Sequence, residues 1–427
     1  MLANTTASGN TAIGSAALGT NTTGANNVSI GYQSLFDNTS GFSNTAVGYR
    51  ALANNTTADN NTAVGNDALI SNTTGTYNTA IGVTSLASNT TASDNVAVGG
   101  DSLYANTTGA NNTAVGVSAL GANTTANDNT AVGKRALYAN TTGTTNTAVG
   151  KNALTANTTA SFNVAVGEGA GDAITTGNYN TAIGRSALTT LTTNAANTAV
   201  GGSALSANTA ANNTAVGYNS LGANTTGTEN TAIGRDAGGT TTTGSRNTCV
   251  GKNARTAATN NDTIVIGYNV SQAGNGFVSM GSGGTTVYIP LTGSTTSWSA
   301  TSDERLKKDV NNFNVGLDFI NNLNPITFNW KKKGEVDSTL ISVYEENSEE
   351  FVRGWDDSTH VGFLAQDIKE QVDSFNLPSG VKLWQEDSNG IQGVADGELI
   401  PMFVNAIKEL SAKCDSLQDE INILKGD

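Results

Sequence analysis

A five-residue motif that returns every 17 residues constrains this chain more than any other feature. The motif is Asn-Thr-Ala-Val/Ile-Gly with small variations, and the spacing of its glycines is 17 throughout except for two steps of 16. The glycines are Gly14, Gly31, Gly48, Gly65, Gly82, Gly99, Gly116, Gly133, Gly150, Gly167, Gly184, Gly201, Gly217, Gly234, Gly251 and Gly267. A fixed period with one short β-type segment per unit is typical of a stack in which each rung packs against its neighbours. Residues 1–267 therefore predict a mostly β fold, a parallel β-roll or β-solenoid shaft.

Each repeat offers few apolar residues for a core. They are the Val or Ile before the glycine and a Leu four residues after it, as in Val47 with Leu52 and Val115 with Leu120, while alanines fill much of the rest. Such small side chains enclose only a thin core, so we expect three chains around a common axis. The glycine is expected where the strand bends or backbones come close, and the Asn-Thr-Thr-Gly of residues 106–109 is turn chemistry whose side chains can stack in ladders. At about 4.8 Å per rung, the shaft is a rod of roughly 75 Å.

This repeat resembles the rolled β heads of trimeric autotransporter adhesins, whose strands also end in Val/Ile-Gly. The period and the Asn-Thr-Thr-Gly segment differ from that family, so the resemblance is to a style of construction. It leaves two alternatives open for the shaft. One is a bacterial surface adhesin, for which an export signal and a membrane anchor are expected and not found. The other is a monomeric Thr-rich solenoid that binds ice.

The composition of the chain changes at Ser302. Of the 21 Lys+Arg and 35 Asp+Glu in the chain, residues 1–301 carry 9 and 11, which leaves 12 and 24 for residues 302–427. The net charges are therefore -2 and -12, and the acidity belongs to the last third. An acidic chain without a basic stripe is a poor candidate for nucleic-acid binding, which needs Lys and Arg against the phosphates.

The sequence offers few residues for disulfides, metal sites or cofactor sites. The two cysteines, Cys249 and Cys414, lie in different sections, so they predict buried thiols without a disulfide framework or thiolate metal site. With a single histidine we expect no metal and no cofactor. No stretch has the pattern of a signal peptide or membrane span, so the Asn-Thr-Thr triplets are interpreted as a structural position and not as glycosylation sites.

After Gly267 the repeat decays and a different section begins. Residues 268–301 contain short β-like pieces and are predicted to be a β-rich connector. In residues 302–400, an apolar segment at helical spacing, an alternating strand at 326–330 and a helix-like segment at 364–372 predict a small α+β domain.

Residues 401–427 carry an apolar seam at spacings of four and three residues. Its members are Phe403, Ile407, Leu410, Cys414, Leu417, Ile421 and Leu424. Such a heptad pattern predicts a coiled-coil helix that joins chains, with an amphipathic helix lying on its own domain as the alternative. Ile at a and Leu at d ordinarily favour two strands, so the seam indicates oligomerisation without specifying three chains.

Four motifs of this section resemble the endosialidase-type intramolecular chaperone domain. They are Ser302-Asp-Glu-Arg-Leu-Lys307, Leu323-Asn-Pro-Ile-Thr-Phe-Asn-Trp330, His360-Val-Gly-Phe-Leu-Ala-Gln366 and Leu399-Ile-Pro401 running into the seam helix. In that family the domain ends phage tail fibres and tailspikes, trimerises, helps the shaft to fold and then cuts itself off. The resemblance places the cut between Thr301 and Ser302.

The residues around Ser302 suit self-cleavage at this position. Ser302 is the expected nucleophile and Lys307 the expected general base, if a neighbouring cation or desolvation lowers the pKa of the lysine. A separation of five residues brings the two only loosely together on a helix, so the spacing permits the pair without proving it. Without the resemblance, Ser302 would be interpreted as an ordinary helix cap. His360 is interpreted as supporting either the domain fold or the cleavage site.

Together these features predict a structural, receptor-binding phage tail-fibre protein whose C-terminal domain assists trimeric folding and is released by autoproteolysis. The expected partners are two further copies of the chain, a host cell-surface receptor (a glycan or a surface protein) and other virion tail proteins, with no nucleic acid and no membrane insertion. The expected location is the virion tail, after assembly in the host cytoplasm. The one expected enzymatic activity is a single cut in its own chain, because the shaft shows no paired carboxylates for a glycosidase.

Overall fold

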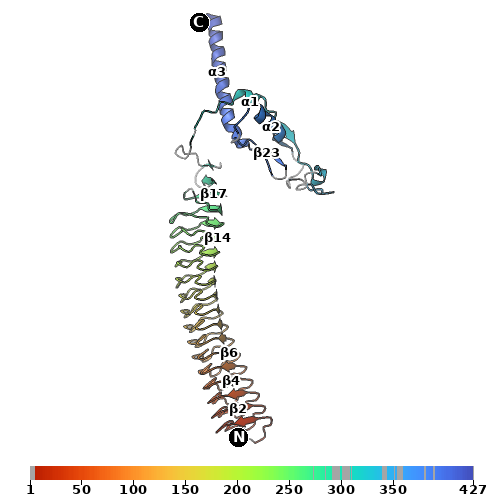
Figure 1. Cartoon of the computed structure of the whole chain (residues 1–427). Helices are drawn as coiled ribbons and strands as arrows, with labels where there is room; N and C mark the ends of the chain where they lie inside the picture. The colour runs from red at the N-terminus through yellow and green to blue at the C-terminus, as the bar shows by residue number, and fades with distance from the viewer. Residues whose placement is uncertain are drawn as a thin grey trace. The chain divides into compact units, whose positions relative to one another are not determined.

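The computed structural model describes residues 5–272, 274–283, 285–290, 299–300, 308, 310–338, 344–350, 352, 359–378, 381–387 and 390–426. The chain divides into two compact units, Met1–Ser302 and Asp303–Asp427, which are called unit 1 and unit 2. Unit 1 is a parallel β-solenoid of 17-residue rungs, and unit 2 combines small β-hairpins with helices (Figure 1). The predicted fold class is confirmed.

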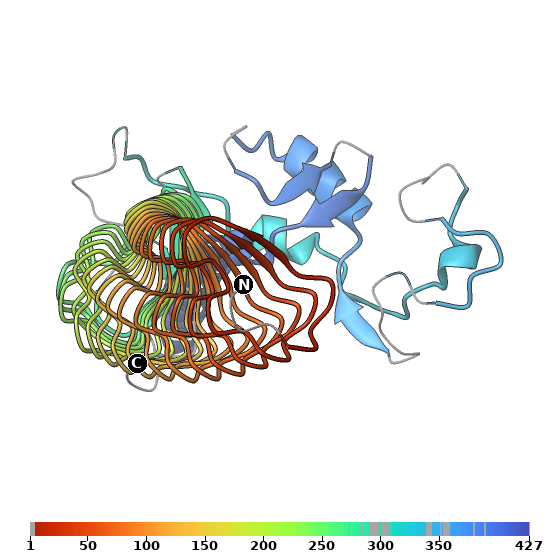
Figure 2. The same ribbon diagram turned by 90° about the horizontal axis from the view of Figure 1, so that it is seen from below.

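Unit 1 has one short strand in each rung. The strands are β1 (Thr11–Ile13), β2 (Val28–Ile30), β3 (Thr45–Val47), β4 (Thr62–Val64), β5 (Thr79–Ile81), β6 (Val96–Val98), β7 (Thr113–Val115), β8 (Thr130–Val132), β9 (Thr147–Val149), β10 (Val164–Val166), β11 (Thr181–Ile183), β12 (Thr198–Val200), β13 (Thr214–Val216), β14 (Thr231–Ile233), β15 (Thr248–Val250) and β16 (Ile264–Tyr268). Each pairs in parallel with the next at the same position of the repeat, as in Ala114 opposite Ala131. Figure 2, viewed from below, shows the coils stacked with a gradual offset.

The stack ends in an antiparallel segment. Strand β17 (Phe277–Ser282) still adds in parallel to β16. Strand β18 (Thr285–Pro290) then turns back along β17, and β19 (Ser299–Ala300) pairs antiparallel with β18. The β-like pieces predicted for the connector are therefore strands.

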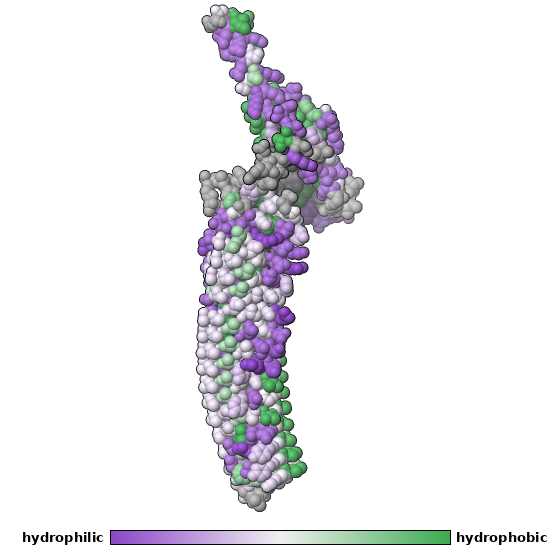
Figure 3. Space-filling model, turned by 60° about the vertical axis from the view of Figure 1, so that its left-hand side comes forward, coloured by the Kyte–Doolittle hydropathy of each residue, from purple (hydrophilic) through white to green (hydrophobic). Residues whose placement is uncertain are grey.

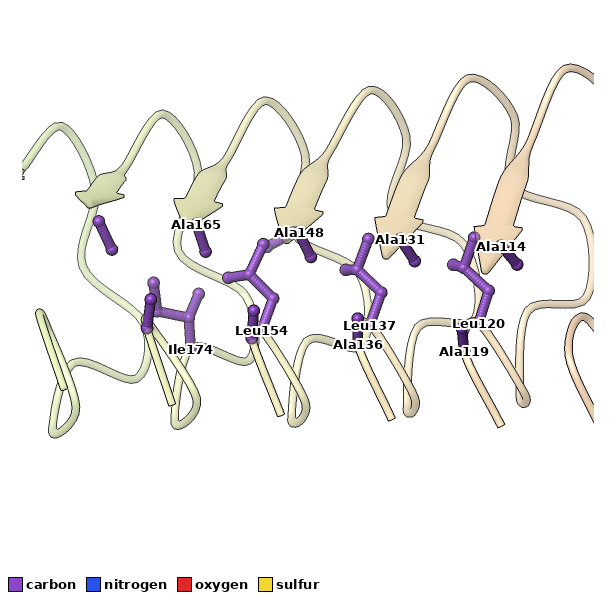
Figure 4. Close-up of a cluster of buried hydrophobic side chains, with 14 of the residues drawn as sticks. Ala114, Ala119, Leu120, Ala131, Ala136, Leu137, Ala148, Leu154, Ala165 and Ile174 are labelled. Carbon is purple, nitrogen blue, oxygen red and sulfur yellow. The ribbon is translucent and has the colours of Figure 1, made fainter. Parts of the chain in front are cut away.

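The interior of unit 1 is built from alanine and leucine. The middle residue of each strand is the inward one, so an alanine column that includes Ala114, Ala131 and Ala148 is buried at 0% exposure. Figure 4 shows a leucine column, with Leu120 and Leu137, facing these alanines. The leucines have positive φ, which costs about 1–2 kcal/mol each, but burying a leucine side chain returns about 1.5–3 kcal/mol.

The Val or Ile before the glycine does not join this core, contrary to the sequence-based expectation. It lies one residue from the inward alanine, so strand alternation turns it outward, and Val115 is 36% exposed. The core also closes within one chain, since the leucines and alanines are buried without a partner. A thin core is therefore no argument for three chains in the shaft.

Two internal asparagine ladders supply the polar part of the core. In the first, which includes Asn112 and Asn129, the backbone N–H of each asparagine donates to the Oδ1 of the asparagine one rung earlier, 3.0 Å away in this pair. In the second, Nδ2 of Asn123 donates to Oδ1 of Asn106 (2.8 Å) and to the carbonyl of Ala126 (3.1 Å). These amides are buried and hydrogen-bonded. The second ladder consists of the Asn-Thr-Thr asparagines and was predicted from the sequence, whereas the first consists of the Asn-Thr-Ala asparagines and was not.

The glycine that follows each strand is required for two reasons. Its φ lies near +130°, for example +127° at Gly99, where other residues are strained. A Cβ atom there would also lie 2.7 Å from the carbonyl carbon of Gly116 in the next rung. The prediction that this glycine marks a close approach of backbones is confirmed.

One rung exchanges its core residues in a compensating way. Gly171 takes the place of the leucine, and Ile174 takes the place of the second-ladder asparagine and fills the space beside it, as the end of the leucine row in Figure 4 shows. The ladder is interrupted there, so Oδ1 of Asn157, one rung earlier, is buried with no hydrogen-bond partner among the described residues. Ile174 thus supplies an apolar side chain beside Gly171, and the ladder loses one hydrogen bond.

Unit 2 has a small core of its own. Its elements are α1 (Leu317–Asn321), β20 (Ile326–Phe328), η2 (Lys333–Glu335), β21 (His360–Gly362), α2 (Ala365–Ser374), β22 (Trp384–Glu386), β23 (Gln392–Val394), η3 (Asp396–Leu399) and α3 (Ile400–Lys425). Strands β20 and β21 form one antiparallel pair, and β22 and β23 form another. Phe319, Ile368, Leu383 and Met402 form the buried centre. Within the described residues, no helix has the length and apolarity to span a membrane.

Candidate functional site

The predicted cleavage residues lie outside the part of the chain that the structure describes. They are Thr301, Ser302 and Lys307, so the pairing of the serine with the lysine stays a prediction. The boundary between the two compact units falls after Ser302, one residue from the predicted cut.

His360 begins β21 and lies opposite Phe328 of β20. The two rings are 5.7 Å apart, and the imidazole is half-buried. Phe328 also packs edge-on against Trp330, with ring centroids 5.3 Å apart. His360 thus packs within the β20–β21 pair, and its predicted supporting role stays a prediction.

A groove of about 670 Å³ lies beside this hairpin. Its lining includes Phe328 and Trp330 from the β20 segment and Phe363 and Gln366 from the segment leading into α2. Two of the four motifs that carry the family resemblance thus line the same groove, together with Gln392 and its neighbours of the β22–β23 hairpin. The motifs were visible in the sequence, but their convergence on one groove was not.

Helix α3 docks on its own unit through one narrow face. Met402 and Ala406 are buried. Nδ2 of Asn405 donates to the carbonyls of Phe313 (2.5 Å) and Val315 (3.2 Å), which lie 92 and 90 residues earlier in the chain.

A second contact of α3 fixes the start of α1. Oε2 of Glu409 accepts from the backbone N–H of Leu317 at 2.9 Å and supplies a cap there. Sequence reasoning missed Asn405 and Glu409, because both appear as ordinary polar positions between the residues of the seam.

The apolar seam of α3 lies on a different face and is exposed. Ile407 is 67% and Leu417 57% exposed, and the remaining members Phe403, Leu410, Cys414, Ile421 and Leu424 are exposed as well. In Figure 1 the C-terminal part of α3 extends away from the rest of unit 2. The seam of α3 therefore does not pack against its own domain, contrary to the alternative interpretation. The expectation of a buried Cys414 is wrong, since the thiol belongs to this seam, whereas Cys249 is buried as expected.

Charged groups of unit 2 pair mainly at its surface. Lys333 Nζ bonds to Glu350 (2.8 Å) and Glu345 (3.1 Å), and these hydrogen bonds raise the pKa of the lysine. The bond from Lys333 likewise lowers the pKa of Glu350. These pairings keep Lys333 charged, which is the opposite of what a general base needs. The described residues contain no cluster of His, Cys, Asp and Glu that could hold a metal ion.

The fold and the site define a class: a β-solenoid shaft followed by a small α+β unit with an exposed apolar helix seam. Residues 302–379 match the family model described as chaperone of endosialidase, and the match begins at Ser302. It supports a C-terminal chaperone domain in this chain. Comparisons with curated proteins and with solved structures gave no match.

Proposed function

We propose that this chain is a receptor-binding tail-fibre subunit of a bacteriophage, located in the virion tail after assembly in the host cytoplasm. Unit 1 is the displayed shaft, and unit 2 aligns three chains while the shaft folds. The observation that carries the proposal is the chaperone-of-endosialidase match, which follows a solenoid of sixteen strands, β1 to β16, and the short connector with β17 to β19. The exposed seam of α3 supports it, because an apolar row in water is stabilised by burial against other copies.

Self-cleavage is part of this proposal. Ser302 Oγ attacks the carbonyl carbon of Thr301 while Lys307 takes the hydroxyl proton, and the acyl group moves from the amide nitrogen of Ser302 to its oxygen. The nitrogen leaves as an amine after gaining a proton. Water then hydrolyses the ester, which gives a shaft ending in the carboxylate of Thr301 and a released unit beginning with Ser302. His360, packed in the first hairpin, has a supporting role.

The direct test is the intact mass of the wild-type chain against Ser302→Ala, with Ser299→Ala as the matched serine control. We expect a wild-type and control fragment that ends at Thr301, and an uncut chain in Ser302→Ala. Full-length chains in all three samples would refute self-cleavage.

The folding role is tested by expressing residues 1–301 alone. We expect insoluble or unassembled shaft, because the element that aligns the chains is missing. A soluble trimeric shaft from this deletion would refute the chaperone role while leaving the fibre assignment standing.

One observation favours a second candidate, a monomeric ice-binding solenoid. The core closes within one chain, and a row of threonines with Thr113 and Thr130 lies on the outer side of the strands. Light scattering that gives one chain per particle, together with thermal hysteresis in a freezing assay, would favour this candidate over the fibre.

A further inference from the structure

The outer side of the solenoid strands forms one continuous uncharged face. It has two columns, the first and the third residue of each strand, because alternate strand residues point the same way. We call it the strand face. Its third-residue column consists of Ile13, Ile30, Val47, Val64, Ile81, Val98, Val115, Val132, Val149, Val166, Ile183, Val200, Val216, Ile233, Val250 and Ile266. Its first-residue column is Thr, apart from Val28, Val96, Val164 and Ile264.

The apolar column of the strand face is exposed or half-buried in a single chain, and none of its members is fully buried. Ile13 is 59% and Ile233 45% exposed, and the glycine that follows each strand offers no side chain to cover its neighbour. In Figure 3 strongly hydrophobic residues form green patches along one edge of the lower part of unit 1. The face is therefore a surface that loses free energy by being covered.

Charge is kept off this face along its whole length. No Asp, Glu, Lys or Arg occurs in either column, although charged residues occur in the same rungs just outside it. Around Val132, for example, Asp128 precedes the strand and Lys134 follows the glycine. Such a distribution, with an apolar centre and charges at the rim, is that of a protein interface.

The size of the strand face also fits an interface. At about 4.8 Å per rung and about 7 Å between alternate strand residues, it measures roughly 75 Å by 10 Å, or about 750 Å². The Val/Ile column makes up about half of this area, which is the size of the largest apolar patch on a typical monomer, about 300–600 Å² and often functional. Two such faces together bury about 1,500 Å², the area of a standard stable interface.

From these observations we infer that the strand face is where copies of this chain meet, with their Val/Ile columns turned toward a common axis. The inference rests on the proposed trimer and adds the surface by which the shafts associate. A second copy is the occupant that fits, because it has the same rung spacing and the same uncharged length and runs parallel once α3 has joined the chains. The shaft, with a net charge of -2, opposes this association only weakly.

Cysteine cross-linking of the full chain tests this inference. The background variant is Cys414→Ser, which removes the exposed thiol of α3. The remaining Cys249 is buried, and burial raises the pKa of its thiol to about 12, so it does not interfere. Val132→Cys places a thiol on the strand face, and the control Thr125→Cys places one at an exposed position outside it.

After mild oxidation, we expect Val132→Cys to give covalent dimers on a non-reducing denaturing gel and Thr125→Cys to remain monomeric. Light scattering on the same samples separates the two proposals. A trimer in which Val132→Cys does not cross-link, or Thr125→Cys cross-links equally, overturns the strand-face inference alone. A monomer overturns the proposed trimer as well, and ice binding by that monomer would assign the face to ice.

Discussion

Unit 1 and unit 2 differ in how completely a single chain buries its apolar residues and pairs its polar groups. In unit 1 the leucines, alanines and most of the ladder asparagines are buried and paired within the coil, so its interior needs no second molecule. In unit 2, α3 buries Met402 and Ala406 but leaves Ile407, Leu417 and the rest of the seam exposed. The difference separates two tasks. Stacking rungs is local and internal, whereas the proposed association of chains would use a helix whose apolar row is exposed in a single chain.

The largest effect is expected from introducing charges into the α3 seam, because this removes the apolar row through which unit 2 is proposed to join chains. Ile407→Asp with Leu417→Asp would bury carboxylates in an apolar seam at a cost of several kcal/mol, so we expect the yield of soluble trimer to fall by about tenfold or more. The yield is measured by size-exclusion chromatography with light scattering.

The matched control for the seam is Ala412→Asp with Ser416→Asp, on the same helix outside the heptad row. We expect it to assemble like the wild type. Equal trimer yields from the seam pair and the control pair would show that α3 does not align the chains.

The next largest effect concerns the internal stacking of unit 1. Gly99→Ala places a methyl group 2.7 Å from the backbone of Gly116 at a φ of +127°, and we expect a loss of about 3 kcal/mol or more in the free energy of unfolding. Gly100→Ala is the adjacent control, because its Cβ meets its nearest atom, the carbonyl oxygen of Val83, at 3.8 Å. Urea unfolding monitored by circular dichroism compares the two. Similar midpoints would mean that the rungs can separate at this glycine without cost.

A smaller effect is expected from restoring the common residues in the exceptional rung. Gly171→Leu alone brings a side chain against Ile174 Cδ1, which lies 3.0 Å from the position of its Cβ, and should destabilise. Ile174→Asn alone leaves a cavity beside the glycine. The double variant carries the leucine and asparagine of most other rungs, so a double-mutant cycle should give a favourable coupling of about 1–2 kcal/mol. Additive single effects would show that the two exchanges are independent.

The smallest effect concerns pH. Partial burial raises the pKa of Asp172 above its ordinary value of 3.8, and its Oδ1 has no hydrogen-bond partner among the described residues. A carboxyl with a raised folded-state pKa favours folding at low pH, and this contribution is lost as the pH rises through that pKa. Asp172→Asn should therefore stabilise at pH 7 by a few tenths of a kcal/mol, since the group is partly exposed, and the gain should shrink as the pH falls toward 3.8. Thermal unfolding between pH 3.5 and 7 checks this, and a constant difference would contradict it.

Sequence reasoning located the strands of unit 1 because the glycine has a physical reason to recur. It assigned the wrong inward residue within each strand. A Thr-Ala-Val strand such as 113–115 presents either its middle residue or its two outer ones to the core, and hydropathy favours the valine. The asparagine ladders and Leu120 already fill the coil, so only the small Ala114 fits opposite them. Likewise the motifs around Trp330 and Phe363 were evident, but their groove depends on long-range packing that no local pattern records.

The near identity of the rungs has a consequence for how long fibres are made. Every strand repeats almost the same three residues, as Thr113–Val115 and Thr130–Val132 do, so neighbouring shafts displaced by one step would lose little more than the contacts of their last rung. Uniform surfaces hold chains together but carry no information about position. The register between neighbouring shafts must then be set at one end, by a segment whose sequence does not repeat, before the identical rungs align one after another.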